Sequence, residues 1–126
     1  MEYSVIRTGS APAPVGPYSQ AVVAGNTVFC SGQLAIDPAT GSLVTGDIQA
    51  QATQIMNNIA AVLEEAGSSL SQIVKVTIFF TNLDNFAAVN EVYGSFFEGK
   101  YPARSAIQVS RLPLNADIEI ECIAVR

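Results

Sequence analysis

Six stretches of this chain alternate apolar with polar residues or gather β-branched and aromatic residues, and each predicts a β-strand. They are residues 2–8, 20–24, 27–34, 73–81, 105–112 and 117–125. Gly25 and Asn26 separate the second stretch from the third and suit a tight turn, which predicts a hairpin. Residues 11–17 hold three prolines and predict an extended loop that leads to Tyr18.

Two other stretches repeat their apolar residues every three or four positions and predict helices. The first helix is capped by Asp47, runs to about Ala66 and ends at Gly67. Its apolar stripe consists of Ile48, Ala52, Ile55, Met56, Ile59, Val62, Leu63 and Ala66. Four polar residues of this helix are expected to point away from the sheet: Gln51, Gln54, Asn58 and Glu65. The second helix spans residues 85–97, with a stripe of Phe86, Val89, Tyr93 and Phe96.

The order of these elements predicts an α+β fold in one domain, residues 1–126. We expect a single mixed β-sheet covered on one face by both helices. The last two strands are joined by Pro113-Leu114-Asn115, a turn-forming segment, and are therefore expected to pair as a hairpin.

The other face of the sheet is expected to need a partner. In the last strand, Asp117, Glu119 and Glu121 alternate onto the same side as Ile123 and Val125. Only 13% of the residues are charged, so part of the apolar surface is expected to be hidden against further copies of the chain. The sequence therefore favours an oligomer.

The sequence also indicates where the protein is located and in which state its cysteines are. The longest apolar run, residues 73–80, is far shorter than the roughly 20 residues of a membrane helix. The amino-terminal residues have no basic start followed by an apolar segment, so we expect a cytoplasmic protein. Two cysteines, Cys30 and Cys122, lie in strand-like runs and are interpreted as reduced core residues.

The chain contains no histidine, which excludes histidine triads and histidine-ligated zinc. Its net charge is -5, so nucleic acid is not expected as a partner. Neither a metal nor an organic cofactor is expected.

One group of residues points to chemistry. Arg104, Ala106, Gln108 and Ser110 alternate on one face of the penultimate strand, and the predicted hairpin would bring Glu119 near that face. An ordinary cross-strand ion pair explains such an arginine and glutamate equally well. Three other candidate residues also have ordinary structural explanations. Tyr18 can anchor a loop on the core, Ser31 can be a small residue within a strand, and Asn90 can face solvent from a helix.

Six short motifs, taken together and in this order, resemble the reactive intermediate deaminase (Rid) family, also called the YjgF/YER057c/UK114 family, and specifically its RidA-like deaminase subgroup. The motifs are Gly16-Pro17-Tyr18-Ser19-Gln20, Ser31-Gly32-Gln33, Asn90-Glu91-Val92-Tyr93, Tyr101-Pro102-Ala103-Arg104-Ser105, Arg111-Leu112-Pro113 and Ile118-Glu119-Ile120-Glu121. The resemblance extends over nearly the whole chain.

The resemblance implies a chorismate-mutase-like subunit that assembles as a homotrimer, with sites between neighbouring subunits. It implies that Arg104 binds a substrate carboxylate and that Glu119 positions a water molecule and accepts a proton from it. Tyr18, Ser31, Gly32, Asn90 and Ala106 would contribute to substrate binding. Many relatives have cysteine where this chain has Ala106, so a thiol-dependent role at that position does not apply.

The implied activity is that of a 2-iminobutanoate/2-iminopropanoate deaminase, which hydrolyses small 2-imino acids to 2-oxo acids and ammonia. Arginine can hold a planar carboxylate with two parallel hydrogen bonds, and a glutamate can activate water for attack on the imine carbon. Two alternatives remain. One is a non-catalytic trimer that binds small 2-oxo acids, and the other is an endoribonuclease, which the acidic net charge disfavours.

Overall fold

A computed structural model describes residues 2–126 of the chain. Its strands are β1 (Ser4–Ile6), β2 (Ala21–Ala24), β3 (Thr27–Gln33), β4 (Ile73–Phe80), β5 (Ala103–Gln108) and β6 (Ile118–Val125). Its helices are α1 (Ile48–Glu65) and α2 (Phe86–Ser95), with short 3-10 helices at Leu70–Gln72, Leu83–Asn85 and Pro113–Asn115. The predicted α+β fold is confirmed.

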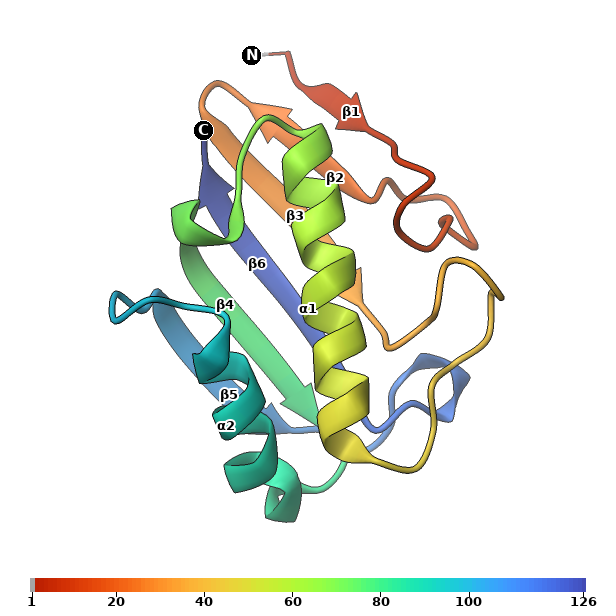
Figure 1. The fold of residues 1–126 in the computed structure, drawn as a ribbon. Helices are drawn as coiled ribbons and strands as arrows, with labels where there is room; N and C mark the ends of the chain where they lie inside the picture. The colour runs from red at the N-terminus through yellow and green to blue at the C-terminus, as the bar shows by residue number, and fades with distance from the viewer. Residues whose placement is uncertain (1) are drawn as a thin grey trace.

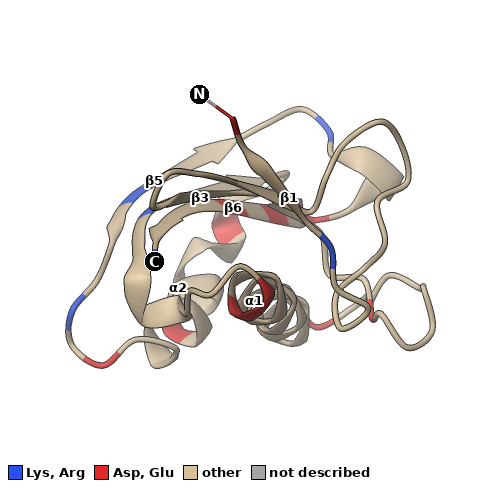
Figure 2. Cartoon of the chain, turned by 90° about the horizontal axis from the view of Figure 1, so that it is seen from above, with Lys and Arg blue, Asp and Glu red and all other residues tan. Residues whose placement is uncertain are grey.

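The strands form one six-stranded sheet in the order β1-β2-β3-β6-β4-β5. α1 and α2 cover the same face, and the opposite face carries no α-helix among the described residues (Figures 1 and 2). The sheet is mixed, because β4 pairs with β5 in parallel while its pairing with β6 is antiparallel. No helix within residues 2–126 is long and apolar enough to cross a membrane.

The predicted hairpin between the last two strands is wrong. β6 lies between β3 and β4, whereas β5 lies at the edge of the sheet and, among the described strands, pairs only with β4. The inward residues of β6, Ile118, Ile120 and Cys122, are buried, and a central position encloses them on both sides. The segment that includes Pro113–Asn115 therefore carries the chain past the end of β4 instead of reversing it into a hairpin.

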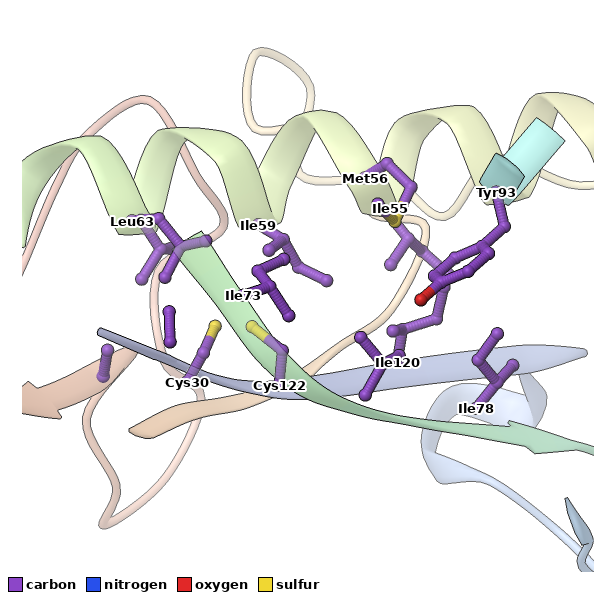
Figure 3. Packing of buried hydrophobic residues seen from close by; sticks show 14 of the residues in the cluster. Cys30, Ile55, Met56, Ile59, Leu63, Ile73, Ile78, Tyr93, Ile120 and Cys122 are labelled. Carbon is purple, nitrogen blue, oxygen red and sulfur yellow. The ribbon is translucent and has the colours of Figure 1, made fainter. Parts of the chain in front are cut away.

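The apolar core lies between α1 and the covered face of the sheet. Ile55, Ile59 and Leu63 of α1 are fully buried and point toward the strands (Figure 3). Burying each such side chain contributes about 1.5–3 kcal/mol. Cys30 and Cys122 are opposite each other on β3 and β6, and both are buried and free, as expected.

Two polar residues of α1 correct the sequence analysis. Gln51 and Asn58 were expected to point away from the sheet, but both are buried. Gln51 donates to Oδ2 of Asp117, at 2.9 Å, so this aspartate contacts α1 instead of extending the uncovered side of β6. Asn58 donates to the carbonyls of Leu34 and Ile36, at 3.3 and 2.9 Å. These amides flank the apolar stripe and hold the segments that enter β6 and leave β3.

The role of Asn58 predicts the effect of its removal. Asn58→Ala leaves two loop carbonyls without their donor, and a buried unsatisfied acceptor costs about 1–3 kcal/mol. We expect the free energy of unfolding to fall by about 2 kcal/mol or more in denaturant titrations. Asn57 is exposed on the same helix, so Asn57→Ala is a matched control that should change stability by less than about 0.5 kcal/mol. Equal effects of the two substitutions would contradict this role.

Candidate functional site

Arg104 lies on the covered side of the sheet, against α2. It is opposite Val76 in the β4–β5 register, and Val76 is buried beneath the helices. Nη1 of Arg104 donates to Oδ1 of Asn90, at 2.5 Å. The guanidinium carbon is 5.3 Å from the ring centroid of Phe86 and 5.1 Å from that of Tyr93. The structure thus brings together Arg104 and Asn90, as the sequence analysis expected for one site.

A pocket of about 420 Å³ lies beside this arginine. Its lining consists of Asn90, Tyr93, Gly94, Tyr101, Pro102 and Arg104. Ala106 is two residues further along β5, half-buried, and packs against the core next to Ile78. Because β5 is an edge strand, its outward backbone groups have no strand partner within residues 2–126 and can bond to another molecule.

Tyr93 faces Arg104 with its ring and not with its hydroxyl. The side chain is buried, and the hydroxyl has no hydrogen-bond partner within the part of the chain described. Burial raises the pKa of Tyr93 to about 12, although the charge of Arg104 acts in the opposite direction. The oxygen points into the core, toward the sheet (Figure 3). At neutral pH this residue therefore presents an uncharged aromatic surface to the guanidinium.

Glu119 lies on the opposite face of the sheet. It alternates with the buried Ile118 and Ile120 and is opposite Phe79 in the β4–β6 register. A second pocket, of about 530 Å³, opens beside it. The pocket combines three further residues predicted for the site, Tyr18, Ser31 and Gly32, with an apolar wall that includes Val15, Leu34, Ile36, Pro113 and Leu114.

A β-bulge shapes this pocket. Cys30 pairs with Cys122 and Gln33 pairs with Ile120, so Ser31 and Gly32 together are opposite the single residue Glu121. A Cβ atom on residue 32 would lie 2.8 Å from the carboxyl carbon of Glu119, which is closer than real contacts allow. The carboxylate of Glu119 can therefore lie over the backbone at this point because residue 32 is glycine.

The loop before β2 is tied to the same bulge. Oγ of Ser31 donates to the carbonyl of Ser19, at 2.6 Å, and the backbone N–H of Ser31 donates to the carbonyl of Gln20, at 2.9 Å. Tyr18, the next residue toward the amino terminus, is 50% exposed at the pocket. Ser31 thus has a structural role as well as its place in the lining, because its hydroxyl already donates within the protein.

The electrostatic surroundings of Glu119 favour its protonated form. Burial raises the pKa of the Glu119 carboxyl above its ordinary value, and the nearby negative charge of Glu121 raises it further. A partly desolvated carboxylate of raised pKa is a better proton acceptor than one in water. No group of three or more His, Cys, Asp or Glu side chains in residues 2–126 could hold a metal ion.

Arg104 and Glu119 do not meet within the chain, which corrects the expectation that they face each other. β4 separates their strands, and the two side chains leave the sheet on opposite faces. The predicted residues therefore form two groups, with Arg104, Asn90 and Ala106 on the covered side and Tyr18, Ser31, Gly32 and Glu119 at the second pocket. Sequence reasoning missed Phe86 and Tyr93 as neighbours of Arg104, because their spacing also fits a core stripe.

Comparisons with known proteins agree with this architecture. Residues 8–126 match the family model described as Endoribonuclease L-PSP. A RutC family protein of Pyrococcus abyssi is 51% identical, over 100% of this chain and 99% of its own length. The chain belongs to the Rid family.

Two further relatives have names that describe an activity or a ligand, and a third is a structurally characterised Rid protein. The 2-iminobutanoate/2-iminopropanoate deaminase of Capra hircus is 45% identical, over 97% of this chain and 89% of its own length. A Rid protein of Yersinia pestis has a solved structure with a TM-score of 0.97 and 48% identity, covering 99% of this chain and 100% of that one. The structure of Escherichia coli TdcF with bound serine has a TM-score of 0.93 and 45% identity, with 98% of both chains covered. The family and fold implied by the sequence motifs are confirmed.

The raised pKa of Glu119 in this Rid protein yields a testable pH dependence. Removing the negative charge in Glu121→Gln should lower the pKa of Glu119, because like charges disfavour ionisation. Desolvation remains, so the pKa should stay above that of an exposed glutamate. Carboxyl-detected NMR titrations of the parent and of Glu121→Gln measure the pKa of Glu119 in each protein. An unchanged Glu119 pKa in the variant would contradict the assigned cause.

Proposed function

We propose that this chain is a 2-iminobutanoate/2-iminopropanoate deaminase that hydrolyses small 2-imino acids to 2-oxo acids and ammonia. The observation that carries the proposal is the pair of complementary groups that the fold presents. These are a positioned guanidinium at one pocket and a partly desolvated carboxylate at another. The name of the goat relative and the serine bound to TdcF support a small amino-acid-like substrate.

We further propose that the site forms between subunits of a homotrimer. Arg104 and Glu119 occupy opposite faces of the sheet, so a substrate can contact both only if a neighbouring copy supplies one of them. The uncovered face presents exposed apolar side chains, among them Phe29, Ile107 and Val125, which further copies would bury. β5 places the Arg104 pocket at the edge of the sheet, where a neighbour can reach it.

The reaction follows from the chemistry of the two groups. Arg104 holds the substrate carboxylate through two parallel hydrogen bonds and so orients the adjacent C=N carbon. Glu119 of the neighbouring subunit accepts a proton from water as the oxygen bonds to that carbon. Glu119 then delivers that proton to the former imine nitrogen, which gives the neutral carbinolamine. As the C–N bond breaks, the proton of the new hydroxyl group passes through Glu119 to the amine, so that ammonia leaves and the 2-oxo acid remains. Every step uses only the chain's own residues and water.

Two alternatives have support. The same arginine pocket could bind 2-oxo acids without turnover, and the absence of imine hydrolysis together with retained binding would indicate that function. The description of the matching family model names an endoribonuclease. Against that activity stand the net charge of -5 and the absence of histidine. Retention of RNA at moderate salt would favour it over the deaminase.

Substitutions at the two groups should produce different defects. Arg104→Lys keeps the charge but loses the planar fork, so it should fail nearly as badly as Arg104→Ala, with a loss of about 2–5 kcal/mol in substrate binding. Glu119→Gln should lower turnover of 2-iminobutanoate by about 10²-fold and leave binding of 2-oxobutanoate nearly intact. Steady-state kinetics and calorimetry measure these effects. Parent rates in Arg104→Lys or Glu119→Gln would contradict the mechanism.

The same glutamate variant separates catalysis from stability. A carboxyl whose pKa is raised by folding binds its proton more tightly in the folded state, so its contribution to stability is lost as the pH rises through the raised pKa. Above the raised pKa, the ionised Glu119 therefore opposes folding. Glu119→Gln should raise the thermal unfolding temperature in that pH range while it lowers turnover. A variant that unfolds more easily would show that its lost activity has a structural cause.

Shared sites also predict complementation between inactive variants. Arg104→Ala and Glu119→Gln subunits, co-expressed with different tags, should form mixed trimers in which some sites combine an intact arginine with an intact glutamate. Random assembly around a closed ring should restore about a quarter of the parent turnover. Light scattering should report trimers throughout. A deaminase that shows no recovery in mixed trimers, or that is monomeric, would exclude sites between subunits.

A further inference from the structure

Helix α2 presents three residues to Arg104 along one line. Phe86, Asn90 and Tyr93 are separated by four and three positions, so they occupy one side of the helix over two turns. Residues seven apart rise about 10 Å along a helix. The guanidinium carbon is 5.3 Å from the Phe86 ring centroid and 5.1 Å from the Tyr93 centroid. The cation therefore lies between the two rings, with Asn90 bonded to one of its nitrogens.

We propose that Phe86 and Tyr93 are positioning residues that hold the Arg104 guanidinium in place for a carboxylate ligand. This inference rests on the function proposed above. Each ring in cation-π contact attracts the guanidinium, and the attraction is strongest where water is excluded. Tyr93 is buried and Phe86 is half-buried, so the rings are partly shielded from water, whereas Asn90 is exposed. We call Phe86 and Tyr93 the aromatic bracket.

The bracket restricts the guanidinium without neutralising it. The guanidinium of Arg104 contacts two uncharged rings and the side-chain carbonyl oxygen of Asn90. A carboxylate in the same place would cancel the positive charge that an anionic ligand needs. With the rings on either side and Nη1 engaged, the remaining N–H groups are left for a planar carboxylate that approaches along the guanidinium edge.

The ring of Tyr93, and not its hydroxyl, carries this role. The hydroxyl is buried, lacks a partner among the described residues and points toward the core (Figure 3). A buried hydroxyl without a partner destabilises the folded state. Tyr93→Phe should therefore keep ligand binding at the parent level and unfold no more easily than the parent. Tyr93→Leu removes the ring and should weaken binding.

The experiment compares variants that remove a ring with variants that keep one. Phe86→Leu and Tyr93→Leu should each raise both the KM for 2-iminobutanoate and the Kd for 2-oxobutanoate by about 5- to 30-fold, with kcat less affected. Phe86→Tyr and Tyr93→Phe should stay within about twofold of the parent. Val89→Ala is the matched structural control, because Val89 is fully buried in α2 and its side chain is no part of the bracket. It should lower the unfolding temperature and leave KM and Kd unchanged.

A second measurement does not depend on turnover or on ligand binding. In NMR spectra of arginine-labelled protein, the Arg104 side-chain N–H signals should show ring-current shifts and slow guanidinium rotation. The exposed Arg7 and Arg111 serve as references. Both features should be lost in Phe86→Leu and Tyr93→Leu and kept in Tyr93→Phe.

Parent-like Arg104 signals in both leucine variants would overturn the bracket, as would unchanged KM and Kd. A Val89→Ala variant that weakens binding as strongly as the leucine variants would also overturn it, because the effect would then be structural. If the parent neither hydrolyses 2-iminobutanoate nor binds 2-oxobutanoate, the proposed function fails and the Arg104 signals alone decide the bracket.

Discussion

The arrangement of this protein depends on one constraint, the burial of alternate side chains of β6 at the centre of a sheet that is covered on one face. Ile118, Ile120 and Cys122 are enclosed beneath α1, so alternation directs Glu119 and Glu121 to the other face. A register shift of one residue would bury both carboxylates under the helix, at several kcal/mol for each charge. The core therefore fixes the side on which the candidate base lies.

The same alternation places Arg104 on the face opposite to Glu119. Its strand runs parallel to β4, and its partner in register, Val76, belongs to the buried side. The arginine and the glutamate thus cannot neutralise each other within a subunit. Arg104 therefore keeps its uncompensated positive charge, held by the Asn90 amide and two aromatic rings. Glu119 is partly desolvated beside Glu121, which raises the pKa of its carboxyl. This separation is the reason for proposing a site shared between copies of the chain.

Local sequence patterns were sufficient to predict the helices and strands and, for most of them, which side is buried. Asp47 caps α1 by accepting from the N–H of Gln49, and the apolar stripe of that helix is buried as predicted. The pattern erred at Gln51 and Asn58, because a polar side chain can be buried when loop groups satisfy its hydrogen bonds. Periodicity records hydrophobicity and does not record such partners.

The sequence by itself determined the fold class, the strand and helix segments and the candidate residues, since these follow from short-range periodicity and from motifs in the chain. Only the tertiary structure decided the strand order. The turn at Pro113–Asn115 suits a hairpin locally, yet long-range burial of β6 between β3 and β4 prevails. That order separates Arg104 from Glu119, places Gly32 under the glutamate and sets Arg104 between Phe86 and Tyr93. Such neighbours are far apart in the chain, and only the packing of the whole sheet brings them together.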